Sequence, residues 1–222
     1  MHSSTSLPSP SPGSACLTRR SRGPALLTAV VLTASVAVNG CSTSSDQAVP
    51  AQSPTPSASA STGSSRDVHF TVGYAGDVLM HMPVMESTPA GSGDITANIA
   101  AETPWVEGLD LALCGMEVPV APDGVYSGYP SFGTSTEVVA ALARSGWDGC
   151  ATASNHAADR GESGVVATLD ALDAHGMGHA GTYRSRQDAS APFALYELER
   201  GGRTVTVAQI STTMDLNGLE DP

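Results

Sequence analysis

Short apolar segments alternate with helix-like segments through most of this chain, and this alternation limits the folds that it can adopt. Val68–Tyr74 has the two-residue periodicity of a half-buried strand, and Leu109–Cys114 and Gly149–Ala153 are apolar runs of strand length. Apolar residues recur at helical spacing in Ile95–Glu107 and Glu162–His175. Strands that alternate with helices usually pair in parallel, so the sequence predicts an α/β fold with a mainly parallel sheet and flanking helices.

Two further segments carry cap and turn signals. Thr134 and Glu137 have the spacing of a capping box before an apolar helix that we expect to end at Gly146. The segment 194–211 is typical of two strands joined at Gly201-Gly202, because a tight hairpin turn favours residues that tolerate positive φ.

The first 41 residues have the pattern of an export signal. Arg19, Arg20 and Arg22 precede the apolar run Pro24–Val38, which is too short for a comfortable membrane span. A small residue stands before Cys41, as in the lipobox of bacterial lipoproteins. We therefore expect a lipid anchor at Cys41 that holds the protein at the extracytoplasmic face of the membrane; cleavage without a lipid is the alternative.

Residues 42–66 consist mainly of Ser, Thr, Pro, Ala and Gln. Such a segment buries too little apolar surface to offset its chain entropy, so we expect a disordered tether. The sequence thus predicts an export signal over residues 1–41, a tether over 42–66 and a folded α/β domain over 67–222.

The charge of the chain narrows the classes of ligand. The formal net charge is −12, and all ten basic residues are Arg. No basic patch remains to neutralise a phosphate backbone, so we expect no nucleic-acid partner. Six His and many carboxylates instead suit a divalent cation.

Cys114 and Cys150 each lie near the end of a predicted strand. A disulfide between them is compatible with an exported protein. Two buried thiols are the commoner outcome for Cys inside strands, so we expect free thiols, with the disulfide as the alternative.

Polar side chains follow each predicted strand. Asp77 follows the first, Glu117 the second, and Asn155 and His156 the third. In parallel α/β sheets, ligands bind beyond the carboxyl ends of the strands. Two carboxylates, an amide oxygen and an imidazole make a suitable ligand set for one or two divalent metals, with Asp77 as the bridging ligand. Each residue alone has a simpler explanation, as a turn, an exposed carboxylate or a helix cap.

Several blocks of sequence, in order, resemble the first half of the CapA family, from about Val68 to Pro222. They are AGDVLMH, LDLALCGMEVPVA, SGYPSFG, TASNHAADRG, TLDALDAHGMGHAGTYRS and TMDLNG. The family consists of bacterial, often lipid-anchored proteins linked to capsule or poly-γ-glutamate synthesis. The resemblance implies a calcineurin-like metallophosphatase fold, an αββα sandwich of which this chain supplies the first half.

The resemblance also assigns residues. Asp77 falls on the family's Gly-Asp motif and Glu117 on the Glu of its Asn-x-Glu motif. Asn155 and His156 fall on the last two positions of Asn-Asn-His, and Asp159 falls on the Asp that follows. These positions imply a binuclear centre of Mn, Fe or Zn.

Two positions depart from the family pattern: Gly115 stands where Asn is usual, and Ser154 replaces the first Asn of Asn-Asn-His. We expect these changes to weaken hydrogen bonding around the ligands more than the ligands themselves. The family's later His-Trp-Gly and Gly-His motifs have no match before Pro222, so the chain supplies about half of a binuclear site. His81 lies close to Asp77 and is a candidate acid; a solvated loop His is the alternative.

Three functions follow from this pattern. The first is a metal-dependent hydrolase or transferase that acts on an anionic envelope polymer or phosphoester, with His156 and His81 as catalytic residues. The second is a non-catalytic lipoprotein that binds or assembles capsule polymer, with membrane proteins of capsule synthesis as partners. Because this domain is acidic, a polyanion would bind it through cations. The third is an inactive fragment.

Overall fold

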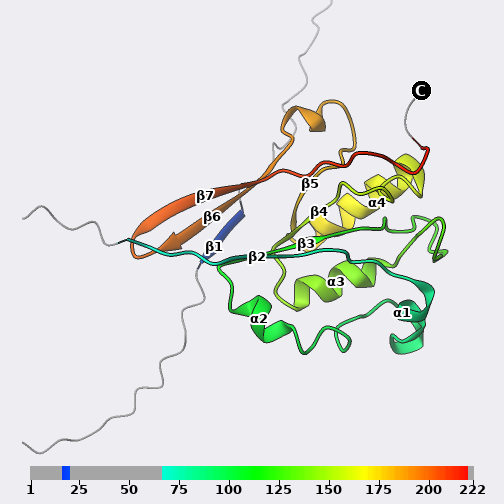
Figure 1. The fold of residues 1–222 in the computed structure, drawn as a ribbon, viewed down its shortest axis with the longest axis horizontal. Helices are drawn as coiled ribbons and strands as arrows, with labels where there is room; N and C mark the ends of the chain where they lie inside the picture. Colours follow the sequence, from blue (N-terminus) through cyan, green and yellow to red (C-terminus); the bar gives the residue numbers. More distant parts are fainter. Residues whose placement is uncertain (1–16, 21–66, 220–222) are drawn as a thin grey trace, which may run out of the picture. The chain divides into compact units, whose positions relative to one another are not determined.

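A four-stranded parallel sheet lies at the centre of the fold (Figure 1). The computed structural model describes residues 17–20 and 67–219. All three pairings in this sheet are parallel, which confirms the α/β class predicted from the sequence. In order across the sheet, the strands are β2 (Val72–Ala75), β3 (Leu111–Gly115), β4 (Gly149–Ala151) and β5 (Gly178–Ala180).

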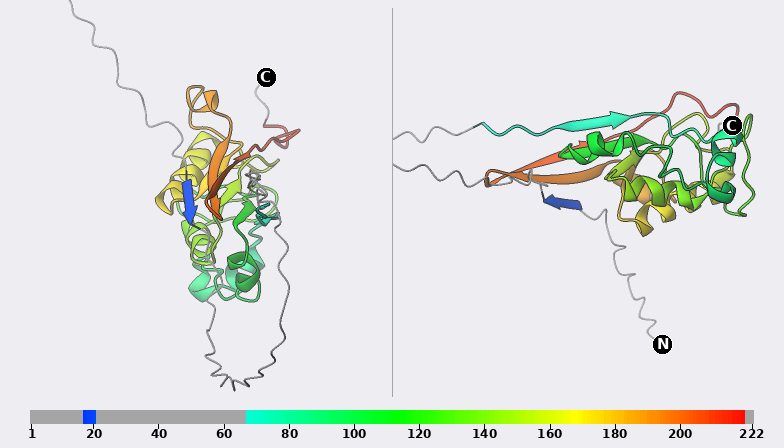
Figure 2. Two further views of the ribbon diagram at one scale, coloured as in Figure 1. Left: turned by 90° about the vertical axis from the view of Figure 1, so that its left-hand side faces the viewer. Right: turned by 90° about the horizontal axis from the view of Figure 1, so that it is seen from below.

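Two amphipathic helices cover one face of this sheet. They are α3 (Thr136–Arg144) and α4 (Gly161–Ala174), which share a buried apolar cluster with β3 and β4 (Figure 2). The expected capping box is wrong by one residue: Ser135, not Thr134, caps α3 and accepts a hydrogen bond from the Glu137 amide. The backbone of Thr134 instead bonds to Pro119, and its side chain is buried, so it is not available as a cap.

The helix expected over Ile95–Glu107 is wrong for most of its length. Turns occupy the first part, and only α2 (Thr103–Glu107) is helical. Pro104 has no amide hydrogen to donate to the preceding turn, so it starts a helix and cannot continue one. The side chain of Asp94 also accepts hydrogen bonds from the backbone and hydroxyl of Thr96, which favours a turn there. The remaining short helices are α1 (Met82–Glu86), η1 (Pro89–Gly91) and η2 (Asp188–Ser190).

The predicted hairpin is present and belongs to a second sheet. Strands β6 (Ala194–Arg200) and β7 (Arg203–Gln209) pair antiparallel. They are joined by Gly201 and Gly202, whose φ values of 60° and 74° fit a type I′ turn. Tyr196 and Leu198 of β6 are buried against the face of the parallel sheet opposite the helices. The turn lies well away from the helices in Figures 1 and 2.

Of the expected export signal and tether, the structure describes only Leu17–Arg20, which forms strand β1 beside β6. Cys41 and the predicted tether, 42–66, lie outside the described residues. Within residues 67–219, no helix has the length and apolar character needed to cross a bilayer.

A disulfide joins the two central strands, so the expectation of two free thiols was wrong. Cys114 of β3 and Cys150 of β4 are register partners, with their Cα atoms 4.4 Å apart. Register partners on adjacent strands point to the same face, which brings the two sulfur atoms together. The sequence could not show this register.

We predict that Cys114→Ala/Cys150→Ala lowers the free energy of unfolding by about 3 to 4 kcal/mol, because the bond closes a loop in the unfolded chain. Urea denaturation of the full chain measures the change. A reductant should shift the midpoint of the wild-type chain and leave that of the double variant unchanged. Equal midpoints for the oxidised wild type and the double variant would contradict the prediction.

Candidate metal site at the ends of the parallel strands

The register of the parallel sheet places the ends of three strands in one row. Ala75 of β2 pairs with Cys114 of β3, which pairs with Cys150 of β4. The loops that carry Asp77, Glu117 and His156 therefore leave the sheet at the same edge. Backbone bonds hold these ends together: the amide of Val78 donates to Gly115 over 2.7 Å.

The side chains of Asp77 and Glu117 meet at this edge. Partial burial raises the pKa of Glu117, and the negative charge of nearby Asp77 raises it further, while the charge of His156 partly opposes the rise. Two carboxyl groups this close disfavour each other's ionised form. The pair is therefore a point of concentrated negative charge that a proton or a cation can neutralise.

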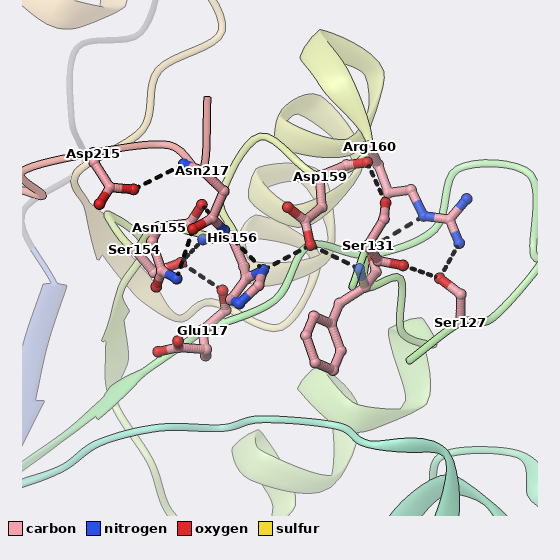
Figure 3. A network of polar contacts seen from close by, with 11 residues as sticks. Glu117, Ser127, Ser131, Ser154, Asn155, His156, Asp159, Arg160, Asp215 and Asn217 are labelled. Carbon is pink, nitrogen blue, oxygen red and sulfur yellow. Dashed lines mark hydrogen bonds and ion pairs between the residues drawn. The ribbon is translucent and has the colours of Figure 1, made fainter. Parts of the chain in front are cut away.

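Ser154 ties the ends of β3 and β4 together. Its hydroxyl donates to the backbone oxygen of Glu117 over 2.5 Å and accepts a hydrogen bond from the amide of His156 over 3.1 Å (Figure 3). The hydroxyl that Ser154 retains thus links the backbones of two predicted ligands.

Asp159 orients the imidazole of His156. Its Oδ2 lies 2.9 Å from Nδ1 of His156 and also accepts a hydrogen bond from the amide of Phe132 over 2.7 Å. The carboxylate side chain is only 3% exposed. The carboxylate oxygen accepts this hydrogen bond, so we assign a ring proton to Nδ1, and Nε2 is the ring nitrogen on the side of Glu117 (Figure 3). A carboxylate behind a histidine is the usual arrangement at metal-binding imidazoles.

Asn155 is held by Asn217, a residue to which the sequence analysis gave no role. Nδ2 of Asn155 donates to Oδ1 of Asn217 over 3.2 Å, and Nδ2 of Asn217 donates to the backbone oxygen of Asn155 over 2.8 Å. Asn217 also approaches Nδ1 of His156, at 3.2 Å. Its φ of 55° places it in the left-handed region, which the Asn-Gly pair in TMDLNG could have signalled.

Phe132 lies between the two histidines proposed as catalytic. Its ring centroid is 4.9 Å from that of His81 and 4.7 Å from that of His156, and both contacts are edge-to-face. Phe132 is 1% exposed, whereas His81 is exposed immediately before α1. His81 and His156 therefore approach one buried ring and are kept apart by it.

Arg160 fixes the loop that carries Phe132. Its guanidinium donates to the backbone oxygens of Val125 and Phe132 over 2.8 and 3.1 Å, and to the hydroxyl of Ser127 over 2.6 Å (Figure 3). This role for the Arg next to Asp159 was not predicted. A guanidinium with several donors in one plane is well suited to hold two backbone oxygens and a hydroxyl.

The structure brings together only part of the predicted ligand set. Among the described residues, no three His, Cys, Asp or Glu side chains are arranged to hold a metal ion. The charges of Asp77 and His156 both act on Glu117, and the amide of Asn155 bonds to Asn217. The groups at this edge, two carboxyl groups and an imidazole, fit a divalent cation chemically.

We predict that Glu117 makes the apo domain less stable as the pH rises. Its pKa in the folded state lies above the ordinary value of 4.5, so the folded state binds more protons than the unfolded state between these two values. Stability from this group is present below pH 4.5 and is lost as the pH rises through the folded pKa. Urea denaturation in EDTA should show that the midpoint of Glu117→Gln rises relative to that of the wild type between pH 4 and pH 7. A difference between the two midpoints that does not change with pH would contradict this.

A protein-family model matches most of the described domain. The family model described as "Bacterial capsule synthesis protein PGA_cap" matches residues 71–221, a range that contains β2 to β7 and the whole candidate site. A search of curated proteins found no match. The family model covers more than half of the chain, and the CapA-like motifs lie inside the matched range. This chain therefore belongs to the CapA family of bacterial capsule synthesis proteins, whose domain is metallophosphatase-like.

Proposed function

We propose that this chain is a metal-dependent hydrolase or transferase of capsule synthesis that acts on an anionic envelope polymer or a phosphoester. The placement of Asp77 and Glu117 just beyond adjacent parallel strands, near enough for the charge of Asp77 to raise the pKa of Glu117, is the observation that supports this proposal most. Membership of the family supports a place in capsule synthesis. The metal and the reaction are our inference from the chemistry of the site.

The residues at the strand ends have distinct tasks in this proposal. Asp77 and Glu117 would hold a divalent cation such as Mn²⁺, Fe²⁺ or Zn²⁺, with Nε2 of His156 and Oδ1 of Asn155 as further ligands. Such a cation supplies Lewis acidity and lowers the pKa of water. Asp159 keeps the proton of His156 on Nδ1, as the 2.9 Å contact supports. His81, on the other side of Phe132, would donate a proton to the leaving group.

The charge of the chain supports a cation-dependent interaction with substrate. With a net charge of −12, the chain repels polyanions. A divalent cation between Asp77 and Glu117 would cancel their two negative charges and could itself bind an anionic oxygen. Poly-γ-glutamate and phosphoesters both present anionic oxygens, so both suit such a site.

A second candidate function is cation-bridged binding of capsule polymer without catalysis. One observation favours it: the described part of the chain contains no group of three His, Cys, Asp or Glu side chains that could hold a metal ion. A pair of carboxylates that shares one cation with a polyanion needs no such cluster.

We predict that the full chain binds Mn²⁺ and that Asp77→Asn and Glu117→Gln each weaken binding at least about tenfold, because each removes a charged ligand. Isothermal titration calorimetry measures the affinity. Glu102→Gln makes the same change of charge at an exposed residue before α2 and should leave the affinity unchanged. Absence of Mn²⁺ binding by the wild type, or equal binding by all variants, would refute the proposal.

The same Mn²⁺-loaded protein separates the two candidate functions. An enzyme should hydrolyse a phosphodiester such as bis(p-nitrophenyl) phosphate, and His81→Ala should lower turnover while Mn²⁺ affinity stays the same. A polymer-binding protein should instead sediment with poly-γ-glutamate only when Mn²⁺ is present, and show no turnover.

We also propose that a lipid at Cys41 anchors the protein to the extracytoplasmic face of the membrane, as its lipobox-like context supports. Cys41→Ser should move the protein from the membrane fraction to the soluble fraction in cell fractionation. Cys16→Ser is the matched control, because that Cys precedes the apolar run, and it should leave the protein in the membrane fraction. Membrane association that survives Cys41→Ser would contradict the proposal.

A further inference from the structure

Tyr74 lies across the ends of β2 and β3. It is the register partner of Leu113, so Gly115, two residues further along β3, is on the same face of the sheet. A Cβ atom added to Gly115 would lie 2.5 Å from the hydroxyl oxygen of Tyr74, and one added to Gly76 would lie 3.5 Å from the ring. The phenol therefore occupies space that a side chain at position 115 would need.

The hydroxyl of Tyr74 is close to the carboxyl pair. Partial burial raises the pKa of Tyr74, and the negative charges of Asp77 and Glu117 raise it further. The hydroxyl consequently keeps its proton at neutral pH and is available as a donor. The residue as a whole is 62% exposed, so a ligand from solvent can reach it.

The phenol of Tyr74 can lie at the end of β3 because Gly115 has no side chain. The Asn-x-Glu motif that this segment resembles would place at this position a side chain with two amide hydrogens to donate. Gly115 has no donor other than its backbone amide, and the Tyr74 hydroxyl lies where an Asn side chain would begin. A phenol contributes a single O–H donor from the neighbouring strand.

We propose that Tyr74 is an anion-binding residue of this site, whose hydroxyl replaces a side chain at position 115 and donates a hydrogen bond to an anionic oxygen of the ligand held at Asp77 and Glu117. This inference rests on the proposed function, because the anion is held there through the cation. Phosphoryl and carboxylate oxygens both fit the donor. A purely structural tyrosine would need only its ring, and phenylalanine would serve equally well.

The test uses the Mn²⁺-loaded full chain, titrated with inorganic phosphate and, separately, with acetate. Tyr74→Phe should weaken anion binding about tenfold and change Mn²⁺ affinity less than about twofold, because it removes one hydrogen bond to a charged group and no ligand. Tyr129→Phe, at another exposed tyrosine, should leave both affinities unchanged. The anion that responds identifies the class of ligand.

Tyr74→Phe/Gly115→Asn provides the rescue. Without the hydroxyl oxygen, the atoms nearest to the new Cβ would be Cα of Gly76 at 3.3 Å and Cζ of residue 74 at 3.5 Å, so the Gly76 backbone must move by a few tenths of an ångström. The Asn amide should then restore anion binding toward the wild-type value. Anion binding that is unchanged in Tyr74→Phe, or a wild-type chain that binds Mn²⁺ but neither anion, would overturn this inference alone. A wild-type chain that does not bind Mn²⁺ would overturn the proposed function and this inference with it.

Discussion

The in-register pairing of parallel strands is the constraint on which the site depends. One row of partners runs from Ala75 through Cys114 and Cys150 to His179, and the chain leaves β2, β3 and β4 just beyond this row. A shift of one residue would turn each side chain to the opposite face. The disulfide between Cys114 and Cys150 fixes the register at the row itself, a few residues before Glu117 and His156.

Beyond the strands, small polar side chains bind one loop to the next. Ser154 joins the Glu117 backbone to the His156 loop. Thr152 bonds to the end of β5, accepting from the amide of Thr182 over 3.0 Å. The buried carboxylate of Asp159 holds both His156 and the backbone of Phe132. The bonds from Ser154 to Glu117, from Thr152 to the end of β5 and from Phe132 to Asp159 join segments far apart in the sequence. The side chains at the site are therefore positioned by the tertiary structure and not by any one loop.

The sequence pattern correctly predicted elements that depend mainly on interactions between neighbouring residues. The hairpin at Gly201-Gly202 and helix α4 follow from turn chemistry and apolar spacing, and both are present. The helix expected over Ile95–Glu107 was wrong for most of its length, because apolar spacing alone predicted it. Pro104 can start a helix but cannot continue one. Strand β5 was missed because Gly178–Ala180 is too short to show a period.

The features that could not be predicted from the sequence depend on contacts between residues far apart in the chain. Cys114 and Cys150 are partners only because of the strand register, and Asn217 reaches Asn155 from the far end of the domain. The position of Tyr74 depends on two glycines, Gly76 and Gly115, on neighbouring strands. Strand order predicted that Asp77 and Glu117 lie at one edge of the sheet, where the charge of Asp77 acts on Glu117. No group of three His, Cys, Asp or Glu side chains that could hold a metal is found among the described residues.

The central claim is that Asp77 and Glu117 share a divalent cation. Crystals of the full chain grown with Mn²⁺, measured at the manganese absorption edge, test it most directly. The account predicts an anomalous peak within about 2.0 to 2.4 Å of a carboxylate oxygen from each residue. A peak bound elsewhere, or no peak between the two carboxyl groups, would contradict it.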